Sequence, residues 1–89
     1  MFQIFVVGDS RRSEAAVDNL RELCAGALGG EAEIEVVDVL LNPERAEEQR
    51  ILATPTVLRV SPPPTRRVIG DLTDFALAAK ALGLPPVES

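Results

Sequence analysis

The sequence predicts an α/β fold in which short strands form one sheet and helices cover it. Three features support this class: an almost unbroken apolar run at the N-terminus, a long segment with apolar residues at helical spacing, and a second apolar run after two glycines. The chain has 89 residues, 46% hydrophobic and 26% charged, which is typical of one folded domain. We expect a single domain over residues 1–89, because no linker-like segment or internal repeat divides the chain.

The first half of the chain has the pattern strand, helix, strand. Residues 2–7 are nearly all apolar and β-favouring, which predicts a strand covered on both faces. Apolar residues recur at helical spacing over 12–28, and Gly29-Gly30 follows as a stop. Residues 33–41 alternate between charged and apolar side chains and end in an apolar run, which predicts a second strand. Two strands joined by a helix form a right-handed crossover.

A short second helix is predicted after the second strand. Asn42 suits the N-cap, and Pro43 suits the first helical position, where the missing N–H removes no hydrogen bond. Glutamates follow in the early turns, where negative charge is favourable. The helix is expected to end near Arg50.

The second half predicts a hairpin and a final helix. Residues 57–60 are typical of a strand, three prolines at 62–64 interrupt it, and residues 66–69 resume an extended pattern. Residues 73–82 are rich in good helix formers, with Gly83 as a stop. The resulting order, β-α-β-α-β-β-α, is the minimal thioredoxin-like arrangement, in which the second strand lies at an edge of the sheet.

Charge and composition argue against several classes of function. The net charge of −5, with no histidine, tryptophan or tyrosine, leaves neither a cationic surface nor stacking rings for nucleic acid. One cysteine and no histidine remove the usual metal ligands and general base, so no metal, cofactor or catalytic residue is expected. The apolar runs are too short to span a bilayer, and no signal peptide precedes them, so the expected location is the cytoplasm without membrane contact.

Redox chemistry of the thioredoxin kind is not predicted. Residues 8–13 occupy the place of the C-x-x-C motif and contain no sulfur, while Cys24 lies near the far end of the helix on its apolar face. A glutathione-binding or redox enzyme using the Pro55 loop would need a nucleophile after the first strand. Thr54-Pro55 precedes the third strand, where thioredoxin-like folds carry a cis-proline; an ordinary trans turn is the alternative.

Several charged residues allow two interpretations. Arg11-Arg12 and Arg66-Arg67 are either solvated pairs or contacts for an acidic partner, and the glutamates at 44, 47 and 48 are either a solvated helix face or a docking surface. Asp38 stands inside an apolar strand, and a buried carboxylate there needs a partner that the sequence does not identify.

Four segments in order resemble the KaiB family: F-V-V-G-D-S at 5–10, V-V-D-V-L-L-N-P at 36–43, A-E-E-Q-R-I-L-A-T-P-T at 46–56 and P-P-P-T-R-R-V-I-G-D-L-T at 62–73. The resemblance implies a non-catalytic component of the bacterial circadian clock. Such proteins bind the ATPase ring of KaiC, sequester KaiA where it exists, and displace a histidine kinase whose sensor domain is thioredoxin-like. It also implies a partner-binding surface consisting of Val36, Val37, Asp38, Val39, Leu40, Leu41, Asn42, Pro43 and Glu47.

The resemblance further implies two folds. The family's resting state, usually a homotetramer, has the order β-α-β-β-α-α-β, and the monomeric thioredoxin-like state binds KaiC. Residues from about Ala53 onward would rearrange, and the expected hinge and cis-proline positions are Pro55, Pro62, Pro63, Pro64, Gly70 and Asp71.

The chain departs from the family at three places. Residues 75–82 are alanine-rich, which disfavours the strand of the resting state and favours the thioredoxin-like fold as the stable one. Leu41 replaces the lysine typical of clock members, and Arg11-Arg12 replaces Pro-Asn. These changes leave open a second interpretation, in which the chain is a diverged thioredoxin-like adaptor or sensor module that partners a histidine kinase or another signalling protein.

Overall fold

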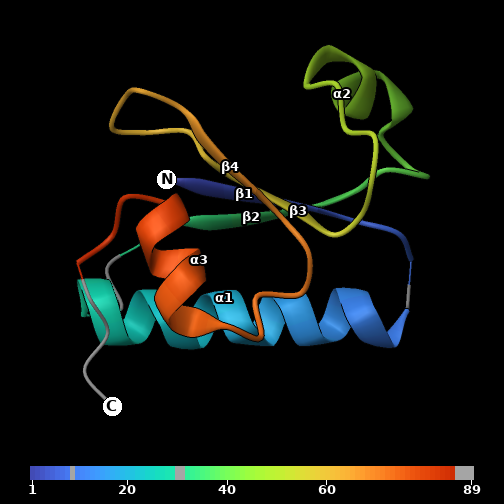
Figure 1. Cartoon of the computed structure of the whole chain (residues 1–89). Helices are drawn as coiled ribbons and strands as arrows, with labels where there is room; N and C mark the ends of the chain where they lie inside the picture. Colours follow the sequence, from blue (N-terminus) through green and yellow to red (C-terminus); the bar gives the residue numbers. More distant parts are fainter. Residues whose placement is uncertain (9, 30–31, 86–89) are drawn as a thin grey trace.

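The computed structural model describes residues 1–8, 10–29 and 32–85. Its elements follow the predicted order and are, along the chain, β1 (Phe2–Val6), α1 (Arg11–Leu28), β2 (Ile34–Asp38), α2 (Pro43–Glu48), β3 (Thr56–Arg59), β4 (Arg66–Ile69) and α3 (Phe75–Ala81) (Figure 1). The prediction of a thioredoxin-like α/β domain is therefore confirmed, and the structure has this order rather than that of the resting state.

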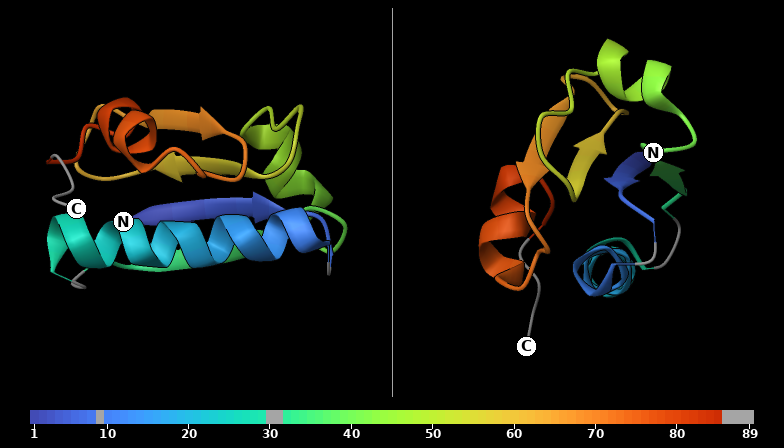
Figure 2. Two further views of the ribbon diagram at one scale, coloured as in Figure 1. Left: turned by 60° about the horizontal axis from the view of Figure 1, so that its bottom comes forward. Right: turned by 90° about the vertical axis from the view of Figure 1, so that its right-hand side faces the viewer.

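The sheet has the strand order β2-β1-β3-β4. β1 is parallel to β2 and antiparallel to β3, and β3 is antiparallel to β4, so β2 and β4 form the two outer edges. Helices α1 and α3 cover one face, while α2 lies on the opposite side near one end of the sheet (Figure 2). The parallel pair is joined by α1, as a crossover requires.

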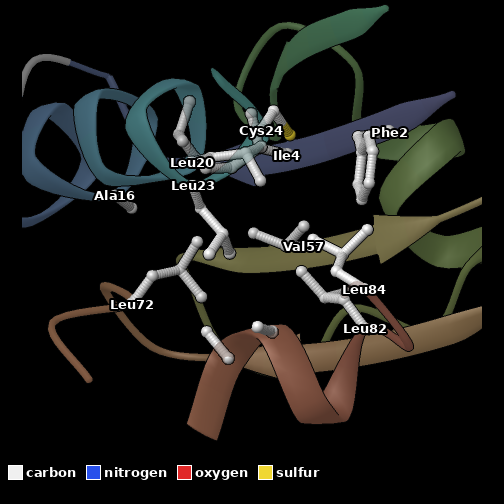
Figure 3. Close-up of a cluster of buried hydrophobic side chains, with 13 residues drawn as sticks. Phe2, Ile4, Ala16, Leu20, Leu23, Cys24, Val57, Leu72, Leu82 and Leu84 are labelled. Atoms are coloured by element: carbon white, nitrogen blue, oxygen red, sulfur yellow. The ribbon is translucent and has the colours of Figure 1, made fainter. Parts of the chain in front are cut away.

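The main core lies between the sheet and the α1/α3 layer. Alternate residues of β1, Phe2 and Ile4, point into it and meet Leu20 and Leu23 of α1 and Val57 of β3 (Figure 3). Phe5 points to the other face, where it packs in a smaller cluster with buried Val37 and Leu58. β1 is thus covered on both faces, which explains its unbroken apolar sequence.

Side chains close both ends of α3. The Asp74 carboxylate accepts from the Leu77 N–H at 3.1 Å, so the helix begins at Phe75 and not at the predicted Thr73. At the other end, Nη1 of Arg59 donates to the carbonyls of Leu82 and Gly83 at 2.8 and 3.1 Å. An arginine of β3 therefore binds the two carbonyls that directly follow α3, while the carbonyls of Ala78, Ala79 and Lys80 accept backbone N–H groups.

Candidate partner-binding surface

The residues predicted to bind a partner lie on β2, on the turn after it and on α2. Leu40 and Leu41 are 68% and 79% exposed, and Val36 is 46% exposed at the outer edge of the sheet. Val37 is only 1% exposed, because its side chain packs in the smaller cluster with Phe5. Its side chain is thus part of the core and is not available to a partner.

The predicted second strand is too long, since β2 ends at Asp38 and the chain turns there. The Asp38 carboxylate accepts from the Leu40 N–H at 2.8 Å, and its carbonyl accepts from the Asn42 N–H at 2.9 Å and Nδ2 at 3.1 Å. Asp38 is half-buried, and its partner is the backbone of its own turn. Asn42 precedes α2 as predicted, but its side chain binds this turn and does not cap the helix.

α2 is held to the sheet by an ion pair with β2. Arg45 donates through Nη1 and Nη2 to the two carboxylate oxygens of Glu35, at 2.8 and 2.7 Å, and Nε2 of Gln3 donates to the same carboxylate at 3.1 Å. The hydrogen bond from Arg45 lowers the pKa of Glu35, and the same bond raises the pKa of Arg45. Because α2 has no buried residue, this pair is a main determinant of its position.

A second anchor joins the end of α2 to β4. The guanidinium of Arg67 donates to the backbone carbonyls of Gln49 and Arg50. Ile51, which follows, packs against the smaller core cluster, and its N–H donates to the carbonyl of Ala46 at 2.9 Å. One arginine of the predicted Arg66-Arg67 pair is therefore engaged within the domain.

Two hollows meet at the start of α2. One, of about 430 Å³, lies between α2 and the segment 51–54, and the other, of about 260 Å³, is lined by residues 41–45; both include Pro43. Leu52 borders the larger hollow and is 95% exposed. We call the exposed side chains of Leu40, Leu41 and Leu52 the apolar corner.

Leu52, Arg45 and Glu35 were not among the predicted site residues. Leu52 stands in an I-L-A segment interpreted as the lead into the third strand, so its exposure was not foreseen. The ion pair joins residues ten positions apart on different elements, for which the sequence gives no local pattern.

Of the predicted hinge positions, Pro55 lies just before β3, next to Thr54 of the larger hollow, and the others lie between β3 and β4 and after β4. The Thr54–Pro55 peptide bond is cis, as predicted, and the Ser61–Pro62 and Pro63–Pro64 bonds are also cis. The Gly70 N–H donates to the carbonyl of Pro55 at 2.9 Å, and the Asp71 carbonyl accepts from Nδ2 of Asn19 at 2.7 Å. Their role in a change of fold stays a prediction.

The start of α1 holds two serines where redox members of the fold carry cysteines. Oγ of Ser10 donates to Oγ of Ser13 at 2.8 Å and accepts from the Ser13 N–H at 3.1 Å, so the pair caps the helix. Cys24 lies in the main core, and burial raises the pKa of its thiol. The arrangement provides a helix cap at this place and keeps the thiol protonated inside the core.

Within residues 1–8, 10–29 and 32–85, no three His, Cys, Asp or Glu side chains are grouped as a metal site. In the same part of the chain, no helix has the length and apolar character that crossing a membrane requires.

The chain resembles known proteins over most of its length. The family model described as "KaiB domain" matches residues 3–84. A "Circadian clock protein KaiB3" of Synechocystis sp. is 36% identical over 86 residues, which are 97% of this chain and 84% of that protein. Two proteins of Prochlorococcus marinus named "Circadian clock oscillator protein KaiB" are 45% and 43% identical over 74 residues, which are 83% of this chain. The matches span 63% and 62% of those two proteins.

Proposed function

This chain belongs to the KaiB family, and from that premise we propose that it is a non-catalytic regulatory protein that binds the ATPase ring of a KaiC-type protein. The observation that supports the proposal most is the apolar corner. Leu40, Leu41 and Leu52 are 68%, 79% and 95% exposed, and Leu41 and Leu52 border the two hollows that share Pro43. Large exposed apolar side chains around a concave surface are typical of protein interaction sites.

The anchoring of α2 supports the same assignment. The two hydrogen bonds from Arg45 to Glu35 and those from Arg67 to the carbonyls after the helix hold α2 from two sides. A surface that is already ordered loses less conformational entropy when it binds. The apolar corner is therefore prepared for docking in the thioredoxin-like fold.

Leu41 defines what the partner must offer. Leucine replaces the lysine typical of clock members at position 41. An apolar residue of the partner would therefore bind more favourably against it than a carboxylate, which would have no opposite charge to pair with. We infer that the KaiC-type partner of this chain has an apolar residue at that contact. A partner other than a KaiC-type ATPase, such as a signalling kinase, is the second candidate, and Leu41 is the residue that favours it.

The fold determines how fast the complex forms. Only the fraction of chains in the thioredoxin-like fold is competent to bind, and the apparent Kd equals the intrinsic Kd divided by that fraction. A chain that rests in this fold therefore binds without a slow change of fold beforehand. The alanine-rich α3, over Phe75–Ala81, is consistent with this state.

The test is size-exclusion co-migration with the KaiC-family ATPase of the same genome, in ATP and in ADP, with the rate of complex formation recorded. We expect capture that depends on the nucleotide and that Leu41→Glu and Leu52→Glu each weaken by about tenfold or more, as loss of an apolar anchor does. Leu77→Asp, on α3 and 64% exposed in the parent chain, is the matched control and should leave capture unchanged. Absence of a complex in both nucleotides contradicts the KaiC assignment and favours the adaptor.

A further inference from the structure

One residue between β4 and α3 has an unfavourable backbone conformation. Leu72 has φ +64°, and among the non-glycine residues of the described chain only Arg50 also has a positive φ. Arg50 directly follows the cap of α2, where a left-handed residue often ends a helix. Leu72 follows a strand, so this reason does not apply to it. Because a left-handed residue brings its Cβ close to the following carbonyl oxygen, other contacts must hold Leu72 in place.

Contacts on both sides of Leu72 hold this conformation. Nδ2 of Asn19, on α1, donates at 2.7 Å to the Asp71 carbonyl, which belongs to the peptide that precedes Leu72. The Asp71 carboxylate accepts at 3.3 Å from the Thr73 N–H, which belongs to the peptide that follows. The leucine side chain is 5% exposed and points into the main core (Figure 3). The hydrogen bond from Asn19 therefore links the strained residue to α1.

α3 is attached to the domain mainly through residues at its two ends. The two buried residues within the helix are alanines, which remove little apolar surface from water, and Phe75 is only partly buried. Larger buried side chains lie outside the helix: Leu72 precedes it, and Leu82 and Leu84 follow it. The first end of α3 is thus held by Leu72 together with Asn19.

The rest of the domain has packing and strand pairing that do not involve residues 71–84. The smaller cluster, which includes Phe5, Val37 and Leu58, lies on the opposite face of the sheet and includes no residue of this segment. The pairing of β4 with β3 ends at Ile69. The four strands, α2 and the smaller cluster can therefore keep their contacts when residues 71–84 move.

We propose that residues 71–84, which we call the α3 strap, open from α1 and the sheet as one unit, and that Asn19 is the latch that keeps the strap closed. When the hydrogen bond to the Asp71 carbonyl is lost, Leu72 is free to leave the left-handed region, and relief of its strain favours opening. The open strap uncovers apolar side chains of the main core, among them Val57, which lies beside Leu82 and Leu84 (Figure 3). The device needs no binding partner, so the isolated chain suffices to test it.

The test is native-state hydrogen exchange, followed by NMR for each amide under conditions in which reclosing is faster than exchange. The amides of Ala78 and Leu82 report on the strap, because each donates to a carbonyl of the preceding turn at 2.9 Å. The amides of β1, an inner strand, report on opening of the whole domain. We expect the strap amides to have the lower opening free energy. Their exchange should also depend less on urea, because opening of the strap exposes less surface than unfolding does.

Asn19→Ala removes the latch and leaves the buried side chains of the core in place. It should raise the exchange rate of the strap amides by about three- to tenfold, as the loss of one hydrogen bond does. Asp18→Ala, at the exposed neighbouring position on α1, is the matched control, since it brings a similar gain in helix propensity. It should leave the exchange of the strap amides unchanged.

Phe5→Leu separates opening of the strap from unfolding of the whole domain. Phe5 is fully buried in the smaller cluster, which stays packed when the strap opens. The variant should raise the exchange rate of the β1 amides by about tenfold, because it removes buried apolar volume. The strap amides should keep their exchange rate, since they exchange without unfolding of this cluster.

Three results would overturn the proposal. They are strap amides that exchange no faster than those of β1 in the unaltered chain, equal exchange of the strap amides in Asn19→Ala and Asp18→Ala, and a Phe5→Leu variant in which strap and β1 exchange rise together. Circular dichroism of each variant establishes that it is folded.

Discussion

Arg45 and Glu35 form a two-pronged ion pair, with hydrogen bonds of 2.8 and 2.7 Å, that joins α2 to β2. The two side chains are 39% and 40% exposed, so the pair is accessible to solvent and positions the helix more than it stabilises the domain. Since α2 contributes no buried residue, its orientation depends on this pair together with Arg67 and Ile51.

Acid should release α2 from this pair. The pKa of Glu35 is lowered from its ordinary value near 4.5 by the hydrogen bond from Arg45. The ionised carboxylate stabilises the native contact at pH values above its ordinary pKa. This stabilisation is lost as the pH falls through the lowered pKa of the folded state. Amide spectra of residues 43–50 should therefore shift at acidic pH.

Arg45→Gln should produce the same shift of the α2 amides at neutral pH and remove their response to acid. Arg21→Gln, at an exposed position on α1, is the matched control and should leave α2 unchanged. Superimposable α2 spectra of Arg45→Gln and the unaltered chain would show that the pair does not position the helix.

The main core should be sensitive to truncation of α1. Leu20 is fully buried between α1 and β1, so Leu20→Ala leaves a cavity and should cost about 2–5 kcal/mol of unfolding free energy. Leu77→Ala, at an exposed position, should change stability by no more than about 0.5 kcal/mol. Urea denaturation followed by circular dichroism measures both, and equal losses would contradict the assignment of Leu20 to the core.

The elements that could be predicted are those with a repeated pattern. β1 and α1 have apolar residues at strand and helix spacing over their whole length, and their neighbours in sequence are also neighbours in space. The end of β2 could not be predicted, because the apolar sequence V-L-L at 39–41 is compatible with both a buried strand and an exposed turn. The turn depends on hydrogen bonds to Asp38 that hydropathy does not encode.

Only the part of the candidate surface that is local in sequence could be predicted. A family motif led to Leu40, Leu41 and Pro43, which lie side by side along the chain. Leu52 and the ion pair of Arg45 with Glu35 join that surface only through tertiary structure.

Residues 75–81 should be helical in solution. We expect backbone carbon shifts typical of a helix over this segment, since alanine favours helices and disfavours strands. Replacing the exposed Ala76 and Ala81 together by valine should lower the stability of this state by about 1 kcal/mol. Strand-like shifts over residues 76–82 of the unaltered chain would contradict the thioredoxin-like fold as its resting state.

Two glycines should respond to alanine in opposite directions. Gly83 ends α3 with φ +68°, and a Cβ there would lie 2.6 Å from Nε of Arg66 and 2.7 Å from Nη1 of Arg59. Arg59 would have to move from the carbonyls that it binds at the end of α3, so Gly83→Ala should cost about 1 kcal/mol or more.

Gly26 lies within α1 at an exposed position, and alanine there should add about 0.5–1 kcal/mol, because it restricts the unfolded chain and favours the helix. Thermal melts of the two variants beside the unaltered chain measure both effects. A Gly83→Ala variant as stable as the parent would mean that Arg59 is not needed at the end of α3. In that case, the link between β3 and α3 would depend on the apolar cluster that Val57 shares with Ala78, Ala79 and Leu82.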